Sequence, residues 1–140
     1  MPYFTAYSLL LLLIVNSSYL SYKYINFYFG GNLLDHLNCT DGCDSVMMSQ
    51  YAMLFGIPVP VYGLAFFIAL TVAFVLFQRG ILQHIVIDFA IAAGLVAASV
   101  FLYILYFQLH MICKFCLISH ILTALFAVNY FGTIRKRYSN

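Results

Sequence analysis

The chain has 140 residues and a formal net charge of +2, with 65% hydrophobic and only 7% charged residues. A soluble domain carries about 25% charged residues, so a soluble fold of this size could not cover so much apolar surface. The composition therefore predicts an integral membrane protein, and the few basic residues form no patch of the size or layout that nucleic-acid binding needs.

Four apolar runs are long enough to cross the hydrocarbon of a bilayer, at about residues 3–22, 59–77, 81–109 and 115–134. Lipid offers no hydrogen-bond partners to the backbone, so the four runs are predicted to be helices. Their apolar residues are continuous and do not alternate with polar ones, which argues against the strands of a β-barrel. The first run could instead be a signal peptide, but it lacks a basic start and a small-x-small cleavage site. The predicted fold class is all-α: a single four-span membrane domain over residues 1–140 that folds as a four-helix bundle.

The first loop, at about residues 23–58, is the one sizeable segment between the predicted spans. Within it, residues 45–55 are predicted to form a short extra helix at the membrane surface. Gly56 suits the left-handed position just past the end of such a helix, and Pro58 blocks its continuation. Pro60 then suits the first turn of the second span.

The distribution of lysine and arginine predicts the orientation of the chain. Arg79 and the basic residues at 135–137 fall on the side of the two termini, whereas the other side holds only Lys23 and Lys114. The termini are therefore predicted to be cytoplasmic. The first loop and the turn at residues 110–113 are predicted to face outward.

All four cysteines fall on the predicted outer side, with Cys39 and Cys43 in the first loop and Cys113 and Cys116 where the fourth helix begins. An oxidising compartment favours two disulfide pairs. The C-x-x-C lies at a helix N-terminus and contains Lys114, and both features favour the reactive thiolate. The pattern therefore predicts a thiol–disulfide relay. Two inert structural disulfides, or a zinc site with four cysteine ligands, are the alternatives that the spacing leaves open.

Three ionisable side chains interrupt the predicted spans. His84 and Asp88 are four residues apart and share a helix face, and we interpret them as a mutually satisfied pair that fixes helix packing. His120 follows Cys116 by four residues on the same face, one turn deeper. It is a candidate for contact with the substrate of that cysteine.

Three stretches resemble the loop and second helix of vitamin K epoxide reductase homologues, particularly the bacterial ones: Cys43-Asp44-Ser45-Val46, Ser49-Gln50-Tyr51 and Phe55-Gly56-Ile57-Pro58-Val59-Pro60-Val61-Tyr62-Gly63. Cys113 and Cys116 match the active-site C-x-x-C of that family. The resemblance covers nearly the whole chain in order and topology. It implies a four-helix bundle around a quinone pocket that opens near the outer leaflet.

The resemblance implies an oxidoreductase that reoxidises a thioredoxin-like disulfide-forming partner and passes the electrons to a membrane quinone, ubiquinone or menaquinone, as co-substrate. By this resemblance, Cys39 exchanges with the partner, Cys43 passes the electrons to Cys113, and Cys116 reduces the quinone. The implied location is the inner membrane of a bacterium, with the cysteines on the periplasmic face. Because the chain ends at Asn140 without a thioredoxin-like domain, the partner is expected to act in trans.

The quinone-binding candidates are Ser49, Phe55 and His120, and no metal is expected. Ser49 matches the serine that the family holds near the quinone. His120 occupies a position where the eukaryotic members resemble each other in having tyrosine. We expect it to donate a proton or a hydrogen bond to the quinone.

Three other functions are alternatives to the thiol oxidase. Vitamin K epoxide reduction itself would fit a eukaryotic source. The disulfide bond protein B family has its C-x-x-C in the first loop, so the reversed order here disfavours it. A non-enzymatic membrane subunit with structural disulfides is the third alternative. A relay needs Cys113 and Cys116 to cycle between thiol and disulfide, whereas a structural pair resists mild reductant.

Overall fold

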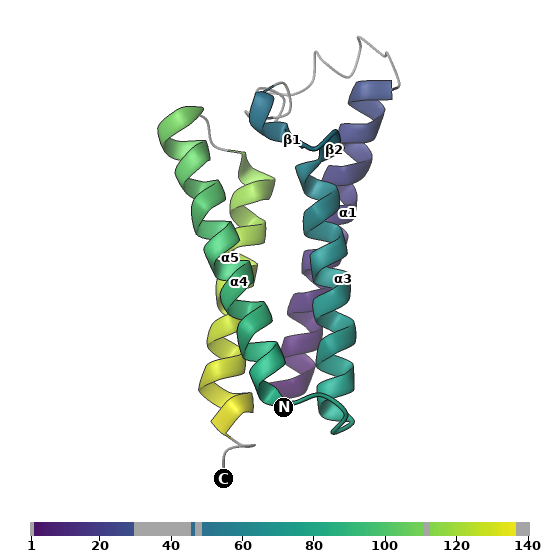
Figure 1. The fold of residues 1–140 in the computed structure, drawn as a ribbon, viewed down its shortest axis with the longest axis vertical. Coiled ribbons are helices and arrows are strands. Elements are labelled where there is room, and N and C mark those ends of the chain that lie inside the picture. Colours follow the sequence, from purple (N-terminus) through teal and green to yellow (C-terminus); the bar gives the residue numbers. More distant parts are fainter. Residues whose placement is uncertain (1, 30–45, 47–48, 111–112, 137–140) are drawn as a thin grey trace.

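A computed structural model describes residues 2–29, 46, 49–110 and 113–136 of the chain (Figure 1). In these ranges, four helices are long and apolar enough to cross a membrane: Tyr3–Asn26, Val59–Gln78, His84–Gln108 and Lys114–Ile134. Lipid offers no hydrogen-bond partners, so apolar runs of this length fold into helices that satisfy their own backbone groups. The predicted all-α membrane bundle is confirmed.

The four helices run alternately up and down and pack as a bundle (Figure 1). They are α1 (Pro2–Phe29), α3 (Val59–Gln78), α4 (His84–Tyr103), which is extended by the π-type turn η3 (Ile104–Gln108), and α5 (Lys114–Asn129), which is extended by the π-type turn η4 (Tyr130–Ile134). Helix α1 packs closely against both α3 and α5, whereas α4 packs less extensively against its neighbours. This looser side of the bundle leaves room for the site described below.

The single helix predicted for residues 45–55 needs correction. Val46 is helical and Gln50–Ala52 forms one 3-10 turn (η2), but Met53–Leu54 (β1) pairs antiparallel with Ile57–Pro58 (β2). Phe55 and Gly56 form the turn between these strands, with φ of 53° and 79°. Two successive positive φ values are typical of a type I′ hairpin turn, which lets this short stretch satisfy its backbone groups locally. The left-handed conformation predicted for Gly56 is confirmed.

The half of the bundle that holds both ends of the chain is tightly packed, and we call it the closed half. Buried apolar side chains from all four helices and from η4 form its core: Ala6, Leu10, Leu70, Phe74, Phe77, Ile87, Ile91, Phe126, Ala127, Tyr130 and Ile134. Edge-to-face contacts join the ring of Phe74 to the rings of Tyr7 and Phe126, with centroids 5.5 and 5.9 Å apart. Such pairs contribute stability beyond the area that they bury.

The interpretation of His84 and Asp88 as a mutual pair is wrong, because Asp88 pairs with Arg135 and not with His84. Asp88 Oδ2 lies 3.2 Å from Nη2 of Arg135, just past η4, and His84 is exposed at the first position of α4. Because α5 runs antiparallel to α4, its basic C-terminal end comes alongside the start of α4. The ion pair of Asp88 therefore links α4 to the end of α5, and its role in helix packing stays a prediction.

Candidate functional site

The half of the bundle at which α5 begins contains a cavity of about 470 Å³, and we call this the open half. Helices α3 and α4 diverge toward this end (Figure 1). Side chains from all four helices line the cavity and most of them are apolar, including Leu20, Val59, Phe66, Phe67 and Phe101. A concave, mainly apolar space of this volume suits a small apolar ligand.

Small residues on α4 create much of this space. Ala93, Gly94, Ala97 and Ala98 line the cavity on one face of the helix. The ring of Phe66 on α3 lies over Gly94, and a Cβ atom added at Gly94 would come within 2.8 Å of the ring atom Cζ. Glycine is therefore required for this approach, and the Phe66 ring borders the cavity because α4 presents no side chain there.

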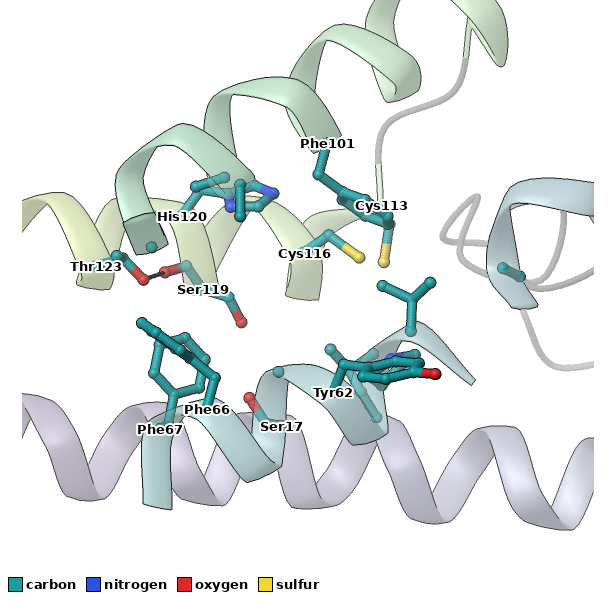
Figure 2. Close-up of a pocket in the computed structure, with 18 of the residues that line it drawn as sticks. Ser17, Tyr62, Phe66, Phe67, Phe101, Cys113, Cys116, Ser119, His120 and Thr123 are labelled. Atoms are coloured by element: carbon teal, nitrogen blue, oxygen red, sulfur yellow. Dashed lines mark hydrogen bonds between the residues drawn. The ribbon is translucent and has the colours of Figure 1, made fainter. Parts of the chain in front are cut away.

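The two cysteines of the C-x-x-C lie on the cavity wall where α5 begins. Cys113 is the N-cap residue of α5 and its carbonyl oxygen accepts the backbone N–H of Leu117 at 3.0 Å. It is buried against Val46 and Leu105. Cys116 follows one turn into the helix and is half-buried, and both side chains point into the cavity (Figure 2).

The two cysteines are in different chemical states. Cys113 is disulfide-bonded, whereas Cys116 has a free thiol. The C-x-x-C is therefore open, with one sulfur already engaged elsewhere and the other available at the cavity. A sulfur in a disulfide cannot be a thiolate ligand, so Cys113 does not fit a four-cysteine zinc site in this state. Cys39 and Cys43 lie outside the described residues.

Of the three quinone-binding candidates, His120 lines the same cavity as Cys113 and Cys116, and Ser49 and Phe55 do not. The His120 ring lines the cavity with its centroid 6.0 Å from that of Phe101. Its Nε2 atom is buried and, within the described ranges, has no hydrogen-bond partner. An unpaired polar atom in such a place is costly unless a ligand satisfies it.

Ser49 and Phe55 lie apart from the cavity lining. The Ser49 hydroxyl donates to the carbonyl oxygen of Val46 at 2.7 Å, in the turn that precedes η2. Phe55 is 93% exposed, because the left-handed backbone of the hairpin turn directs its side chain away from the bundle. The quinone-binding role of these two residues stays a prediction.

The sequence reasoning missed three polar residues of this region. Ser17 and Ser119 line the cavity, and Asn16 joins α1 to α5 by donating from Nδ2 to Ser119 Oγ at 2.6 Å and to the Phe115 carbonyl at 3.0 Å. Asn16 could have indicated this contact from the sequence, because an amide side chain inside an apolar span favours hydrogen-bond partners on another helix.

Comparison with known protein families identifies the family of this chain. The model of the vitamin K epoxide reductase family matches residues 4–130, a range that holds most of the bundle and both cysteines of the C-x-x-C. No curated protein and no solved structure matches the chain.

Proposed function

Since the chain belongs to the vitamin K epoxide reductase family, whose members are oxidoreductases, we propose that it is a membrane thiol oxidase that supports disulfide formation outside the cytoplasm. Its electron donor is a thioredoxin-like protein that acts in trans, and its electron acceptor is a membrane quinone, ubiquinone or menaquinone. The observation that carries the proposal is the open C-x-x-C, with the free thiol of Cys116 facing an apolar cavity.

The relay is a series of thiol–disulfide exchanges that ends on the quinone. The partner's dithiol reduces a disulfide between Cys39 and Cys43, and the partner leaves oxidised. Cys43 then attacks Cys113, which forms a mixed disulfide and releases Cys116 as a thiol. A bonded Cys113 beside a free Cys116 is the state expected after this step.

Reduction of the quinone closes the cycle. Cys39 attacks Cys43, which restores the outer disulfide and frees the Cys113 thiol. Cys113 and Cys116 then lose two electrons and two protons as their disulfide re-forms, and the quinone gains both to become the hydroquinone. The net reaction is oxidation of one partner dithiol to a disulfide for each quinone reduced.

His120 is the proposed hydrogen-bond or proton donor to the quinone. It is four residues after Cys116, so the two share a helix face one turn apart. Its unpaired, buried Nε2 has no partner in the described ranges that would compete with a ligand carbonyl. An unchanged rate of quinone reduction in His120→Phe would count against this role.

The proposed orientation has both termini in the cytoplasm of a bacterial cell and the cysteines on the periplasmic face. Arg79 and Arg135 lie at the end of the bundle that holds the termini (Figure 1). An excess of basic residues on one side favours the cytoplasm for that side. In intact cells, a membrane-impermeant maleimide should leave an introduced Gln83→Cys unlabelled until the membrane is opened.

The test of the function is quinone reduction by the purified protein, followed by absorbance with a reduced thioredoxin-like protein as donor. Turnover is expected with ubiquinone or menaquinone, and Cys116→Ala should abolish it. Ile118→Ala is a matched control, because that side chain is exposed on the same helix and does not line the cavity. A folded protein that turns over with neither quinone and with several donors would support a structural subunit instead.

A further inference from the structure

Asn16 makes an inter-helix contact that changes how a serine of α5 is bonded. Its Nδ2 atom lies 2.6 Å from Ser119 Oγ and 3.0 Å from the carbonyl oxygen of Phe115. The carbonyl can only accept, so the amide must present its NH₂ group here and not its oxygen. Ser119 Oγ is therefore the acceptor of the bond from Asn16.

This arrangement distinguishes Ser119 from the other helical hydroxyls of the chain. A serine or threonine in a helix commonly donates to the carbonyl four residues earlier. Five hydroxyls do so here at 2.8 to 2.9 Å: Ser8, Ser21, Thr71, Ser99 and Thr123. For Ser119 that carbonyl belongs to Phe115, and the amide of Asn16 occupies it.

The hydroxyl proton of Ser119 is consequently available to a ligand. In the described part of the chain, Ser119 Oγ accepts one bond and donates none. The residue lines the cavity three positions after Cys116, on the same face of α5. Figure 2 shows its side chain directed from α5 toward α1, and Cys116 and His120 line the same cavity.

We propose that Ser119 is a second hydrogen-bond donor to a ring carbonyl of the quinone and that Asn16 is the residue that positions it. The assignment rests on the proposed function and specifies its acceptor site. A quinone carbonyl has no proton to share, so it needs a donor whose own proton is uncommitted. As the carbonyl oxygen gains electron density during reduction, a donor already in place stabilises it more strongly, so Ser119 acts on the rate as well as on binding.

Quinone binding can be measured at Cys116 without any partner protein. The purified protein is alkylated with a maleimide in the presence of a short-chain ubiquinone or menaquinone that is fully substituted on its ring, so that no thiol adds to it. Mass spectrometry of the Cys116 peptide then gives the quinone concentration that protects half of the thiol. A lost neutral hydrogen bond is expected to raise this concentration about 3- to 10-fold in Ser119→Ala and in Asn16→Leu.

Three further variants make the result specific. Thr123→Val is the matched control, because Thr123 lines the same cavity but its hydroxyl is committed to the carbonyl of Ser119, and protection should stay within about twofold of wild type, well below the loss of a hydrogen bond. Ser119→Thr keeps a hydroxyl and should restore protection. Asn16→Leu combined with Ser119→Ala should weaken binding no more than Ser119→Ala alone, because both changes remove the same bond.

The outcomes separate this assignment from the proposed function. Wild-type protection in Ser119→Ala, or an equal loss in Thr123→Val, would overturn the role of Ser119 even if the protein oxidises its donor. A quinone that fails to protect Cys116 in the wild type would overturn it as well. Protection that depends on Ser119, in a protein that never turns over, would sustain the binding site and reject the thiol oxidase.

In steady-state assays Ser119→Ala is expected to lower kcat together with apparent quinone affinity, whereas a purely structural change would lower the thermal unfolding temperature alone.

Discussion

The two halves of the bundle are built from the same four helices, yet one is filled and the other is hollow. In the closed half, large rings such as Phe74, Phe77 and Phe126 interlock across α3 and α5. In the open half, α4 presents Gly94 and Ala97 toward α3 and a cavity of about 470 Å³ remains. Large rings fill the closed half, whereas small side chains on α4 leave the cavity open, so side-chain size accounts for much of the difference.

The largest expected difference between the halves is in stability. Phe74→Ala removes a fully buried ring and leaves a void in the core. The free energy of unfolding in detergent should fall by about 2 kcal/mol, because the cost grows with the volume of the void. The value is below that for soluble cores because lipid is as apolar as the protein interior. Phe66→Ala is the comparison, and it should cost less than about 1 kcal/mol because one side of this ring already borders a cavity. Equal losses in the two variants would remove the distinction between the halves.

A smaller cavity in the open half should weaken quinone binding. Gly94→Ala would place a methyl group 2.8 Å from the Phe66 ring and force that ring to move. We expect a loss of about 1 kcal/mol, or about fivefold, in quinone affinity, measured by protection of Cys116 from maleimide. Gly63→Ala is the matched control, because Gly63 also lines the cavity but an added Cβ meets nothing within 4 Å. A larger effect at Gly63 would show that the Phe66 contact does not limit the site.

A smaller effect is expected at the ion pair of the closed half. Asp88→Asn removes the charge that faces Arg135, whose side chain is 50% exposed, so the free energy of unfolding should fall by only about 0.5 to 1 kcal/mol. The loss should shrink at high salt, because solvent ions screen an exposed pair. His84→Ala should have no effect, since His84 is exposed and is not the partner of Asp88. A matching loss in His84→Ala would restore the pairing that the sequence suggested.

The smallest effect is expected at the hairpin turn outside both halves. Phe55→Asn places Asn-Gly, the preferred type I′ pair, where a phenylalanine now has φ of 53°. Stability should rise by about 0.5 kcal/mol, since asparagine tolerates the left-handed region better. Quinone reduction should be unchanged, because Phe55 does not line the cavity. A loss of turnover would instead support the quinone contact predicted from the sequence.

Most of the fold was predictable because the bilayer limits the chain to helices. The predicted spans differ from the helices mainly at their ends: the third run was predicted from residue 81, but α4 begins at His84, after a turn in which Gly80 has φ of 74°. The short helix at residues 45–55 was predicted from capping signals alone. A stretch of this length can satisfy its backbone hydrogen bonds in more than one way. The two-residue turn at Phe55 and Gly56 makes a hairpin of residues 53–58, which replaces the predicted end of the helix, whereas Val46 is helical.

The candidate site was predictable only in part. Cys113, Cys116 and His120 follow from spacing along one helix, which sets their shared face whatever surrounds them. The partners of Asp88 and Ser119 were not predictable, because they lie on other helices and no local pattern encodes which helix packs where. The roles of Cys39 and Cys43 remain predictions.

The sequence by itself determined the class of this protein, the number of its spans and the helix face that carries Cys116. These properties depend on the length of apolar runs and on residue spacing, which the solvent and helix geometry convert directly into structure. Only the tertiary structure decided that the space between α3 and α4 stays hollow, that Arg135 pairs with Asp88, and that Asn16 occupies the carbonyl to which Ser119 would otherwise donate. Each of these depends on contacts between residues far apart in the chain, and such contacts exist only once the helices have packed.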